Sequence, residues 1–278
     1  MLPDFLFIGA AKCGSTWFFD VLREHPQIFV PRAKDIYYFD QHYDRPREWY
    51  ERFFREAEPG HRRVGEISHD YLFSREAADR ILADLGRIRL LACLRDPIDR
   101  AVSAYSFMCR NGTAAETFRA TIEAQPRLIE RGRYTEHVRY YRDRFGDALK
   151  IVLFDDLRQD PGAVALDCYR FLGVDEDFAG ESTDRRSLPA SRARVQWLAR
   201  LTKQAAWRLR EWGFADVIGR VKSSPLTSML YRPLRPGERF HLSPEDRAWL
   251  QGYFASDVEE LRKLLDHPLD GWLESADT

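Results

Sequence analysis

Several features that would assign this 278-residue chain to a familiar class are scarce in its sequence. It contains only four cysteines, with no Cys-x-x-Cys pair and no close Cys/His spacing. The cysteine spacing excludes the common zinc motifs and is typical of free thiols in a reducing compartment. The net charge is −1, which gives no reason to expect bulk electrostatic binding to nucleic acid or to an anionic membrane.

Long hydrophobic runs are also absent. No apolar run reaches about 18 residues, so the sequence predicts no membrane span. The first residues, MLPDFLFIGAAKCGS, lack the basic segment and the long apolar segment of a secretory signal peptide, so we expect a cytoplasmic protein. With 44% hydrophobic residues, a chain of this length buries a large core without disulfides or metal ions.

Short apolar runs alternate with segments of helical spacing. The runs at residues 5–8, 89–94 and 150–154 predict buried strands, because each is short and is followed by glycine or charged residues. Helical spacing is present at residues 15–24, 45–58, 74–86, 99–108, 134–144, 162–172, 192–213 and 244–265. This alternation predicts an α/β fold with a P-loop-like central parallel sheet, helices on both faces and a largely helical C-terminal part.

A glycine-containing loop joins the first predicted strand to the first predicted helix. It reads Gly9-Ala10-Ala11-Lys12-Cys13-Gly14-Ser15-Thr16. Backbone N–H groups of such a turn, the positive end of the helix, an ammonium group and two hydroxyls together form a cradle for a phosphate. The plain alternative is a glycine turn that carries an exposed lysine.

The residue order in this loop differs from two other phosphate-binding motifs. A nucleoside-triphosphatase loop has its lysine after the last glycine, whereas Ser15 stands there and Lys12 lies two residues before Gly14. No apolar strand ending in a magnesium-binding aspartate supports that interpretation, and the loop is not a GxGxxG dinucleotide motif. A P-loop kinase or triphosphatase therefore remains only an alternative.

A second element follows the second predicted strand. Arg95 comes directly after that strand, and Ser103 lies eight residues later in a predicted helix. A guanidinium offers a planar fork for a phosphate, and a helical hydroxyl is able to meet the same group. The alternative is a strand-ending turn with a surface ion pair.

These two elements, in this order, resemble the nucleotide-binding segments of sulfotransferases that use 3′-phosphoadenosine-5′-phosphosulfate (PAPS). The resemblance assigns the 5′-phosphosulfate to Lys12, Cys13, Gly14, Ser15 and Thr16. It assigns the 3′-phosphate to Arg95 and Ser103, with later basic contacts from Arg192 and Arg194. The alternative is that these two arginines are solvent-exposed basic residues at the start of a helix and do not contact the nucleotide. Trp17 either stacks on the adenine or is a core aromatic residue.

Further segments are similar to the heparan sulfate N- and 3-O-sulfotransferases and related bacterial enzymes. They are Lys34-Asp35-Ile36-Tyr37-Tyr38-Phe39, Gly65-Glu66-Ile67-Ser68-His69-Asp70-Tyr71 and Phe171-Leu172-Gly173-Val174. The likeness covers about residues 4–175. In that branch the acidic residue at the position of Asp35 is the catalytic base. Here it is Asp rather than Glu, and His69 and Glu66 are the other candidates.

The resemblance implies transfer of a sulfuryl group from PAPS to a hydroxyl, in preference to an amine, by in-line displacement. The second product is 3′-phosphoadenosine-5′-phosphate (PAP), and no metal is required. The acceptor is a small molecule, a lipid or a carbohydrate. Ile67 stands where heparan-type enzymes often carry lysine, which favours an uncharged or hydrophobic acceptor over a polyanion. A sulfotransferase-fold protein that binds a nucleotide without transferring sulfate is the non-enzymatic alternative.

We expect a single sulfotransferase domain over residues 1–278. Residues 180–240 show a less regular hydrophobic pattern and are rich in Arg, Ser and Pro. This segment is either a lid or acceptor-binding annex or a surface loop without a role in the site. The sequence gives no indication of the oligomeric state.

Overall fold

The protein is described by a computed structural model that covers residues 1–183, 191–193, 231–233 and 240–274. The chain forms two compact units. The first comprises residues 1–94 and 137–187, and the second comprises residues 95–136 and 188–278. Most of the predicted annex at 180–240 lies outside the described residues, and the prediction of a single domain stays a prediction.

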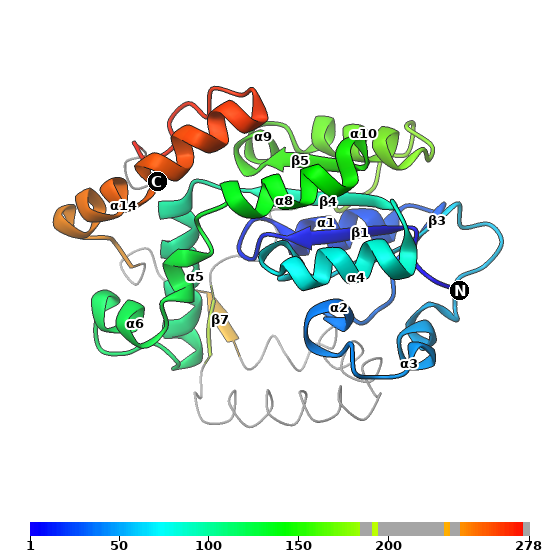
Figure 1. Ribbon diagram of the computed structural model, residues 1–278, viewed down its shortest axis with the longest axis horizontal. Helices are drawn as coiled ribbons and strands as arrows, with labels where there is room; N and C mark the ends of the chain where they lie inside the picture. Colours follow the sequence, from blue (N-terminus) through cyan, green and yellow to red (C-terminus); the bar gives the residue numbers. More distant parts are fainter. Residues whose placement is uncertain (184–190, 194–230, 234–239, 275–278) are drawn as a thin grey trace. The chain divides into compact units, whose positions relative to one another are not determined.

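A five-stranded parallel sheet forms the centre of the first unit (Figure 1). Its strands, in spatial order, are β2 (Ile28–Phe29), β3 (Arg63–Ile67), β1 (Phe5–Gly9), β4 (Arg89–Leu94) and β5 (Leu149–Leu153). All four pairings are parallel, which confirms the predicted sheet and three of its strands. Strands β2 and β3 were not predicted. Strand β2 has only two residues, and the glycine and glutamate of β3, which reads RVGEI, interrupt its apolar run.

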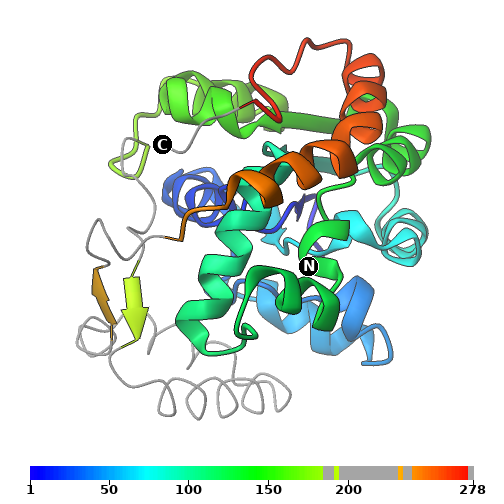
Figure 2. The ribbon, with the colours of Figure 1, turned by 90° about the vertical axis from the view of Figure 1, so that its left-hand side faces the viewer.

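Helices cover both faces of this sheet, as expected for parallel strands. In Figures 1 and 2, α1 (Ser15–Glu24) and α10 (Pro161–Leu172) lie on one face, and α4 (Arg75–Leu85) and α8 (Thr135–Phe145) lie on the other. The shorter helices of this unit are α2 (Tyr38–Gln41), α3 (Arg47–Glu51) and α9 (Phe154–Gln159). The helix predicted at 45–58 is shorter than expected, because residues 52–54 tighten into a 3₁₀ turn after α3.

The described part of the second unit is mainly helical. Its elements are α5 (Pro97–Asn111), α6 (Phe118–Ala124), α7 (Arg127–Glu130), α14 (Pro244–Leu265) and an antiparallel pair of β6 (Ser191–Ala193) with β7 (Tyr231–Pro233). The helix predicted at 192–213 is wrong at residues 192–193, because these residues pair with a strand about 40 positions later, which local spacing cannot reveal. Residues 194–213 lie outside the described part.

Helix α5 begins at Pro97, two residues before the predicted start at residue 99, because Asp96 caps its first turn. Asp96 accepts hydrogen bonds from the backbone N–H groups of Ile98 (2.7 Å) and Asp99 (3.0 Å), and Pro97 occupies the first helical position. The carboxylate of Asp257 on α14 accepts from the backbone N–H of Tyr134 at 2.7 Å. This contact joins α14 to the segment that follows α7 within the second unit.

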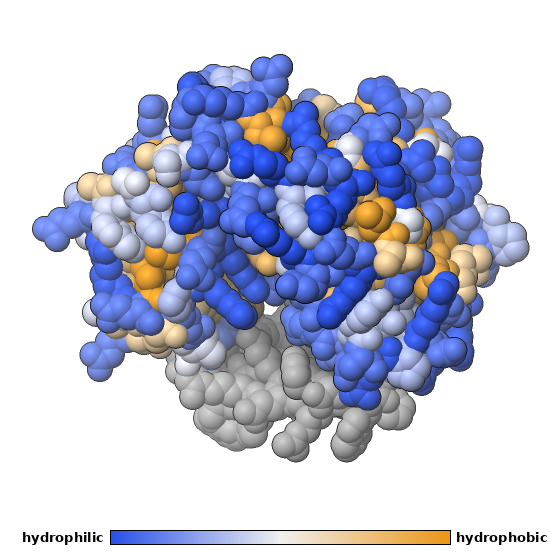
Figure 3. Space-filling model, in the orientation of Figure 1, coloured by the Kyte–Doolittle hydropathy of each residue, from blue (hydrophilic) through white to orange (hydrophobic). Residues whose placement is uncertain are grey.

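Hydrophilic residues predominate on the face shown in Figure 3, where apolar residues form separate small patches. Four large hydrophobic side chains are exposed among the described residues: Met1, Phe107, Leu166 and Trp249. Isolated exposures of this kind are normal for a globular protein. Within the same residues, no helix is long and apolar enough to cross a membrane.

Substituting Gly65 by alanine should weaken the pairing of β1 with β3. A β-carbon on Gly65 would come within 2.1 Å of the Phe5 ring, which is itself fully buried, so the core would have to shift. We expect the free energy of unfolding to fall by about 1–3 kcal/mol in a urea titration. Gly60→Ala is the matched control, because a β-carbon there meets nothing within 4 Å. Equal stability of the two variants would contradict this packing.

Candidate active site

Two glycines fix the shape of the predicted phosphate loop. Gly9, at the end of β1, has a φ of 147°, and a β-carbon on it would lie 2.9 Å from the carbonyl oxygen of His69. Gly14, which precedes α1, has a φ of 86°, and its β-carbon would lie 2.8 Å from Leu157. Both positions therefore require glycine. Lys12, between them, adopts a φ of 72°, a conformation that is uncommon for a residue with a side chain and is concentrated at functional sites.

A lysine outside the loop contacts the hydroxyls that the loop contributes. Lys34 Nζ donates to Ser15 Oγ at 3.0 Å and to Thr16 Oγ1 at 3.2 Å. Burial lowers the pKa of Lys34, while the nearby carboxylates of Asp35 and Asp20 oppose this shift. In the sequence, Lys34 is one residue of the segment that resembles the heparan sulfate sulfotransferases, and no local pattern indicates its contact with Ser15 and Thr16.

Asp35 and His69 form a close pair at the carboxyl end of β3. Asp35 Oδ1 lies 2.6 Å from His69 Nδ1, and the Tyr37 hydroxyl lies 2.9 Å from His69 Nε2. In a neutral imidazole this arrangement assigns the proton to Nδ1, which donates to the carboxylate, so Nε2 accepts from the tyrosine. The backbone N–H of Asp35 donates to the carbonyl of Ile67 at 2.9 Å, which ties the segment to the end of β3.

The backbone around this pair adopts an unusual conformation. Asp35 has a φ of 63° and Tyr37 has a φ of 56°, both in the left-handed region. The carboxylate of Asp35 and the imidazole of His69 are each partly exposed. Together with Lys12, three of the six residues other than glycine that have positive φ among those described lie in this part of the first unit. Such a concentration is a feature of binding and catalytic sites.

Glu66 is enclosed in the core of the first unit. Its side chain is 0% exposed and accepts hydrogen bonds from the hydroxyls of Tyr50, Ser68 and Tyr71. Burial raises the pKa of Glu66 to about 7, although these three hydrogen bonds act in the opposite direction. Ser68 also accepts from the backbone N–H of Tyr37, so the buried carboxyl supports the segment that carries Asp35.

Trp17 lies inside the first unit, on the buried side of α1. It is 4% exposed, its ring packs edge-on against Phe18, and its indole N–H donates to the carbonyl of Thr183 at 3.0 Å. This environment favours the core alternative over stacking on an adenine. Cys13, another predicted loop residue, is also buried, and its thiol lies 3.7 Å from the carbonyl oxygen of Ala11.

The predicted 3′-phosphate residues belong to the second unit. Arg95 follows the end of β4, and its Nη2 lies 3.2 Å from Asp99 Oδ2. Ser103 is half-buried on α5, one turn after Asp99, so the two share a face of the helix. Arg192 lies in β6, where only the backbone is described, and Arg194 lies outside the described residues.

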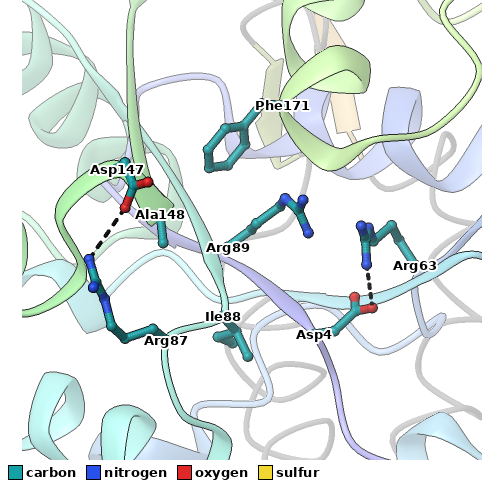
Figure 4. A pocket seen from close by; sticks show the side chains of 8 residues that line it. All are labelled: Asp4, Arg63, Arg87, Ile88, Arg89, Asp147, Ala148 and Phe171. Atoms are coloured by element: carbon teal, nitrogen blue, oxygen red, sulfur yellow. Dashed lines mark hydrogen bonds and ion pairs between the residues drawn. The ribbon is translucent and has the colours of Figure 1, made fainter.

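A hollow of about 650 Å³ lies elsewhere in the first unit (Figure 4). It is lined by Phe171 of α10 and by residues at or near the amino ends of β1, β3, β4 and β5, which are Asp4, Arg63, Arg87, Ile88, Arg89, Asp147 and Ala148. The phosphate loop follows the opposite, carboxyl end of β1. Ligands of open α/β sheets bind beyond the carboxyl ends of the strands, so this hollow is not the candidate active site.

The described residues contain no group of three or more His, Cys, Asp or Glu side chains that is able to hold a metal ion.

Comparison with known proteins identifies the family. The family model described as "Sulfotransferase domain" matches residues 2–202. The chain belongs to the sulfotransferase family. This match confirms the family and the enzyme class that the phosphate loop and the Arg95 segment predicted.

Three curated relatives are similar to the chain. Mouse bifunctional heparan sulfate N-deacetylase/N-sulfotransferase 4 is 27% identical over 304 residues, which cover 98% of this sulfotransferase and 31% of the relative. Human heparan sulfate glucosamine 3-O-sulfotransferase 3B1 is 27% identical over 185 residues, which cover 62% of this chain and 46% of the relative. Membrane-associated sulfotransferase kil1 of Dictyostelium discoideum is 34% identical over 108 residues, which cover 38% of this chain and 23% of the relative. The chain spans less than half the length of each relative.

Solved structures confirm the fold. A sulfotransferase from Alicyclobacillus acidocaldarius is 26% identical with a TM-score of 0.72, and the match covers 98% of this chain and 99% of the other. The sulfotransferase domain of the Synechococcus PCC 7002 olefin synthase is 15% identical with a TM-score of 0.50 and covers 90% and 94%. The second likeness concerns the fold alone.

The buried carboxyl of Glu66 predicts how stability depends on pH. Its pKa is about 7 in the folded chain, against an ordinary value of 4.5, so the folded chain binds more protons between these pH values. Stability should therefore fall as pH rises from about 4.5 to 7, by about 3 kcal/mol at most from this group. Glu66→Gln should remove this part of the slope in urea titrations across that range.

Stability of the Glu66→Gln variant should still fall slightly with rising pH, because burial also raises the pKa of Asp40, to about 6. Glu58→Gln, at an exposed position, is the control and should keep the full slope. An identical pH dependence in the wild-type protein and Glu66→Gln would show that Glu66 does not titrate in this range.

Proposed function

We propose that this protein transfers the sulfuryl group of PAPS to a hydroxyl of an acceptor by in-line displacement and releases PAP. One observation supports this proposal most directly: the phosphate loop and the Asp35–His69 pair lie at the same edge of the sheet. The loop leaves the carboxyl end of β1, and His69 follows the carboxyl end of the neighbouring β3. Parallel neighbours end at the same edge of a sheet, so both groups serve one reaction site.

The loop residues suit a 5′-phosphosulfate. The backbone N–H groups of Gly14, Ser15 and Thr16 stand at the start of α1, where the helix dipole favours negative charge. Lys12 adds a cation for the bridging and leaving oxygens. On the basis of the family resemblance, Arg95 and Ser103 would hold the 3′-phosphate, and the ion pair of Arg95 with Asp99 would give way to it.

Asp35 is the proposed catalytic base. It takes the proton from the acceptor hydroxyl while the acceptor oxygen bonds to sulfur and the bond from sulfur to the bridging phosphate oxygen breaks. The negative charge moves to the leaving 5′-phosphate, which Lys12 and the loop amides stabilise. This transfer requires no metal ion.

His69 is a positioning residue in this proposal. Its two ring nitrogens face the carboxylate of Asp35 and the hydroxyl of Tyr37, which leaves the imidazole as the group that orients the base. Glu66 has a different role, because three hydroxyls and full burial enclose its carboxyl. We assign Glu66 to support of the segment around Tyr37.

We propose an uncharged acceptor. Two of the relatives are named for heparan sulfate, a polyanion. In this chain Ile67 occupies the position where those enzymes often carry lysine, and it is 1% exposed in β3. A desulfated heparan oligosaccharide, simple phenols and small alcohols should be compared as acceptors. Activity on the oligosaccharide alone would contradict an uncharged or hydrophobic acceptor.

Nucleotide binding tests the donor. Calorimetric titration without metal should give a dissociation constant for PAP in the micromolar range or below, with AMP at least about tenfold weaker because it lacks the 3′-phosphate. Arg95→Ala should remove most of this difference. Equal affinity for PAP, AMP and ATP, or no binding at all, would reject PAPS as the donor and favour a different phosphate-using enzyme.

Replacement of Asp35 by asparagine tests the base. The amide keeps the shape of the side chain and loses the ability to accept a proton, so turnover should fall by about 10²- to 10⁴-fold. PAP affinity should stay within a few-fold of the wild-type value. The measurement is the rate of PAP formation from PAPS with the best acceptor of the panel.

Asp147→Asn is the control for this experiment, because the side chain of Asp147 is 99% exposed on the far edge of the sheet. Wild-type turnover in Asp35→Asn would exclude Asp35 as the base, and His69→Ala would then be the variant to measure.

A further inference from the structure

Lys34 occupies a position that is electrostatically unfavourable in the absence of an anion. Its ammonium donates to Ser15 and Thr16, the first two residues of α1. A helix N-terminus carries a partial positive charge, which favours anions and repels a lysine. The hydroxyls are neutral partners, so they satisfy two of the three N–H donors of Lys34 without neutralising its charge.

No carboxylate of the described residues lies within 4.0 Å of Lys34 Nζ. Asp35 and Asp20 act on it from a greater distance, and burial lowers its pKa despite them. An ammonium group that is withdrawn from water is normally paired with a negative charge. The two carboxylates only partly offset the burial of the ammonium, so a negatively charged group at the start of α1 would be favoured beside Lys34.

The neighbouring residue points to what supplies that charge. Asp35 has a φ of 63°, and this turn in the backbone sends Lys34 to the phosphate loop while Asp35 reaches His69. One dipeptide thus brings a cation to the start of α1 and a carboxylate to the proposed acceptor side.

We infer that Lys34 is a second cationic ligand of the 5′-phosphate, acting with Lys12 to hold this group and to stabilise the charge it acquires as the leaving group. The inference rests on the proposed function. When the phosphate binds, an oxygen of that group takes a hydrogen bond from the ammonium of Lys34 beside the hydroxyls of Ser15 and Thr16. The competing role is a tether that only fastens the segment before Asp35 to α1.

A pair of nucleotides separates these roles without knowledge of the acceptor. PAP carries both phosphates, whereas adenosine 3′-monophosphate lacks the 5′-phosphate. Lys34→Met should raise the dissociation constant of PAP about 10- to 100-fold, the usual effect of losing a charge-assisted hydrogen bond, and leave that of adenosine 3′-monophosphate unchanged. Lys34→Arg should keep PAP binding within a few-fold of the wild type, because it retains the charge.

Lys263→Met is the control, since Lys263 is a surface lysine on α14 with a side chain 71% exposed. Thermal unfolding of each variant reports whether it is folded. Wild-type affinity of Lys34→Met for PAP would overturn the inference. An equal loss of both nucleotides, or a loss of PAP binding in Lys34→Met and Lys34→Arg together with a lower unfolding midpoint, would also overturn it in favour of the tether. If the wild-type protein does not bind PAP, the proposed function itself fails.

Discussion

The parallel pairing of β1 with β3 is the constraint on which the candidate site depends. Phe5 lies opposite Gly65 and Phe7 lies opposite Ile67, so the two strands end at the same edge of the sheet. The absence of a side chain on Gly65 makes room for the Phe5 ring, and the absence of one on Gly9 makes room for the backbone of His69. These two close approaches bring the loop after β1 against the segment after β3. Without them, the cations and the proposed base would belong to separate surfaces.

Charge is divided between the two sides of this edge. Lys12 and Lys34 belong to the loop side, where the start of α1 already favours an anion. Asp35 and His69 form the other side, where Asp35 Oδ1 lies 2.6 Å from His69 Nδ1. The proposed sulfuryl transfer would use this division, because negative charge would grow on the leaving phosphate while a proton leaves the acceptor. The buried carboxyl of Glu66 supports this side through two hydrogen bonds. It accepts from the hydroxyl of Ser68, which itself accepts from the backbone N–H of Tyr37.

The sequence predicted those parts whose signal is local. Strands β1, β4 and β5 each contain a short apolar run, and the phosphate loop has a recognisable order of glycine, lysine and hydroxyl residues. Strand β3 was missed because its glycine is required by Phe5 and its glutamate by three hydroxyls, and neither need is visible in a local pattern. Lys34 was missed for a similar reason, since its partners lie 18 and 19 residues earlier in the chain. The tether of Trp17 to Thr183, 166 residues later, likewise depends on tertiary structure.

A crystal structure of the protein with PAP, grown without added metal, is the most direct measurement of where the donor binds. We expect the 5′-phosphate oxygens within hydrogen-bond distance of the backbone N–H groups of Gly14, Ser15 and Thr16 and of the ammonium of Lys12. The carboxylate of Asp35 should remain beside His69. A nucleotide found in the arginine-lined hollow at the amino ends of the strands, with the loop at Gly14 unoccupied, would contradict a sulfuryl-transfer site at the carboxyl edge of the sheet.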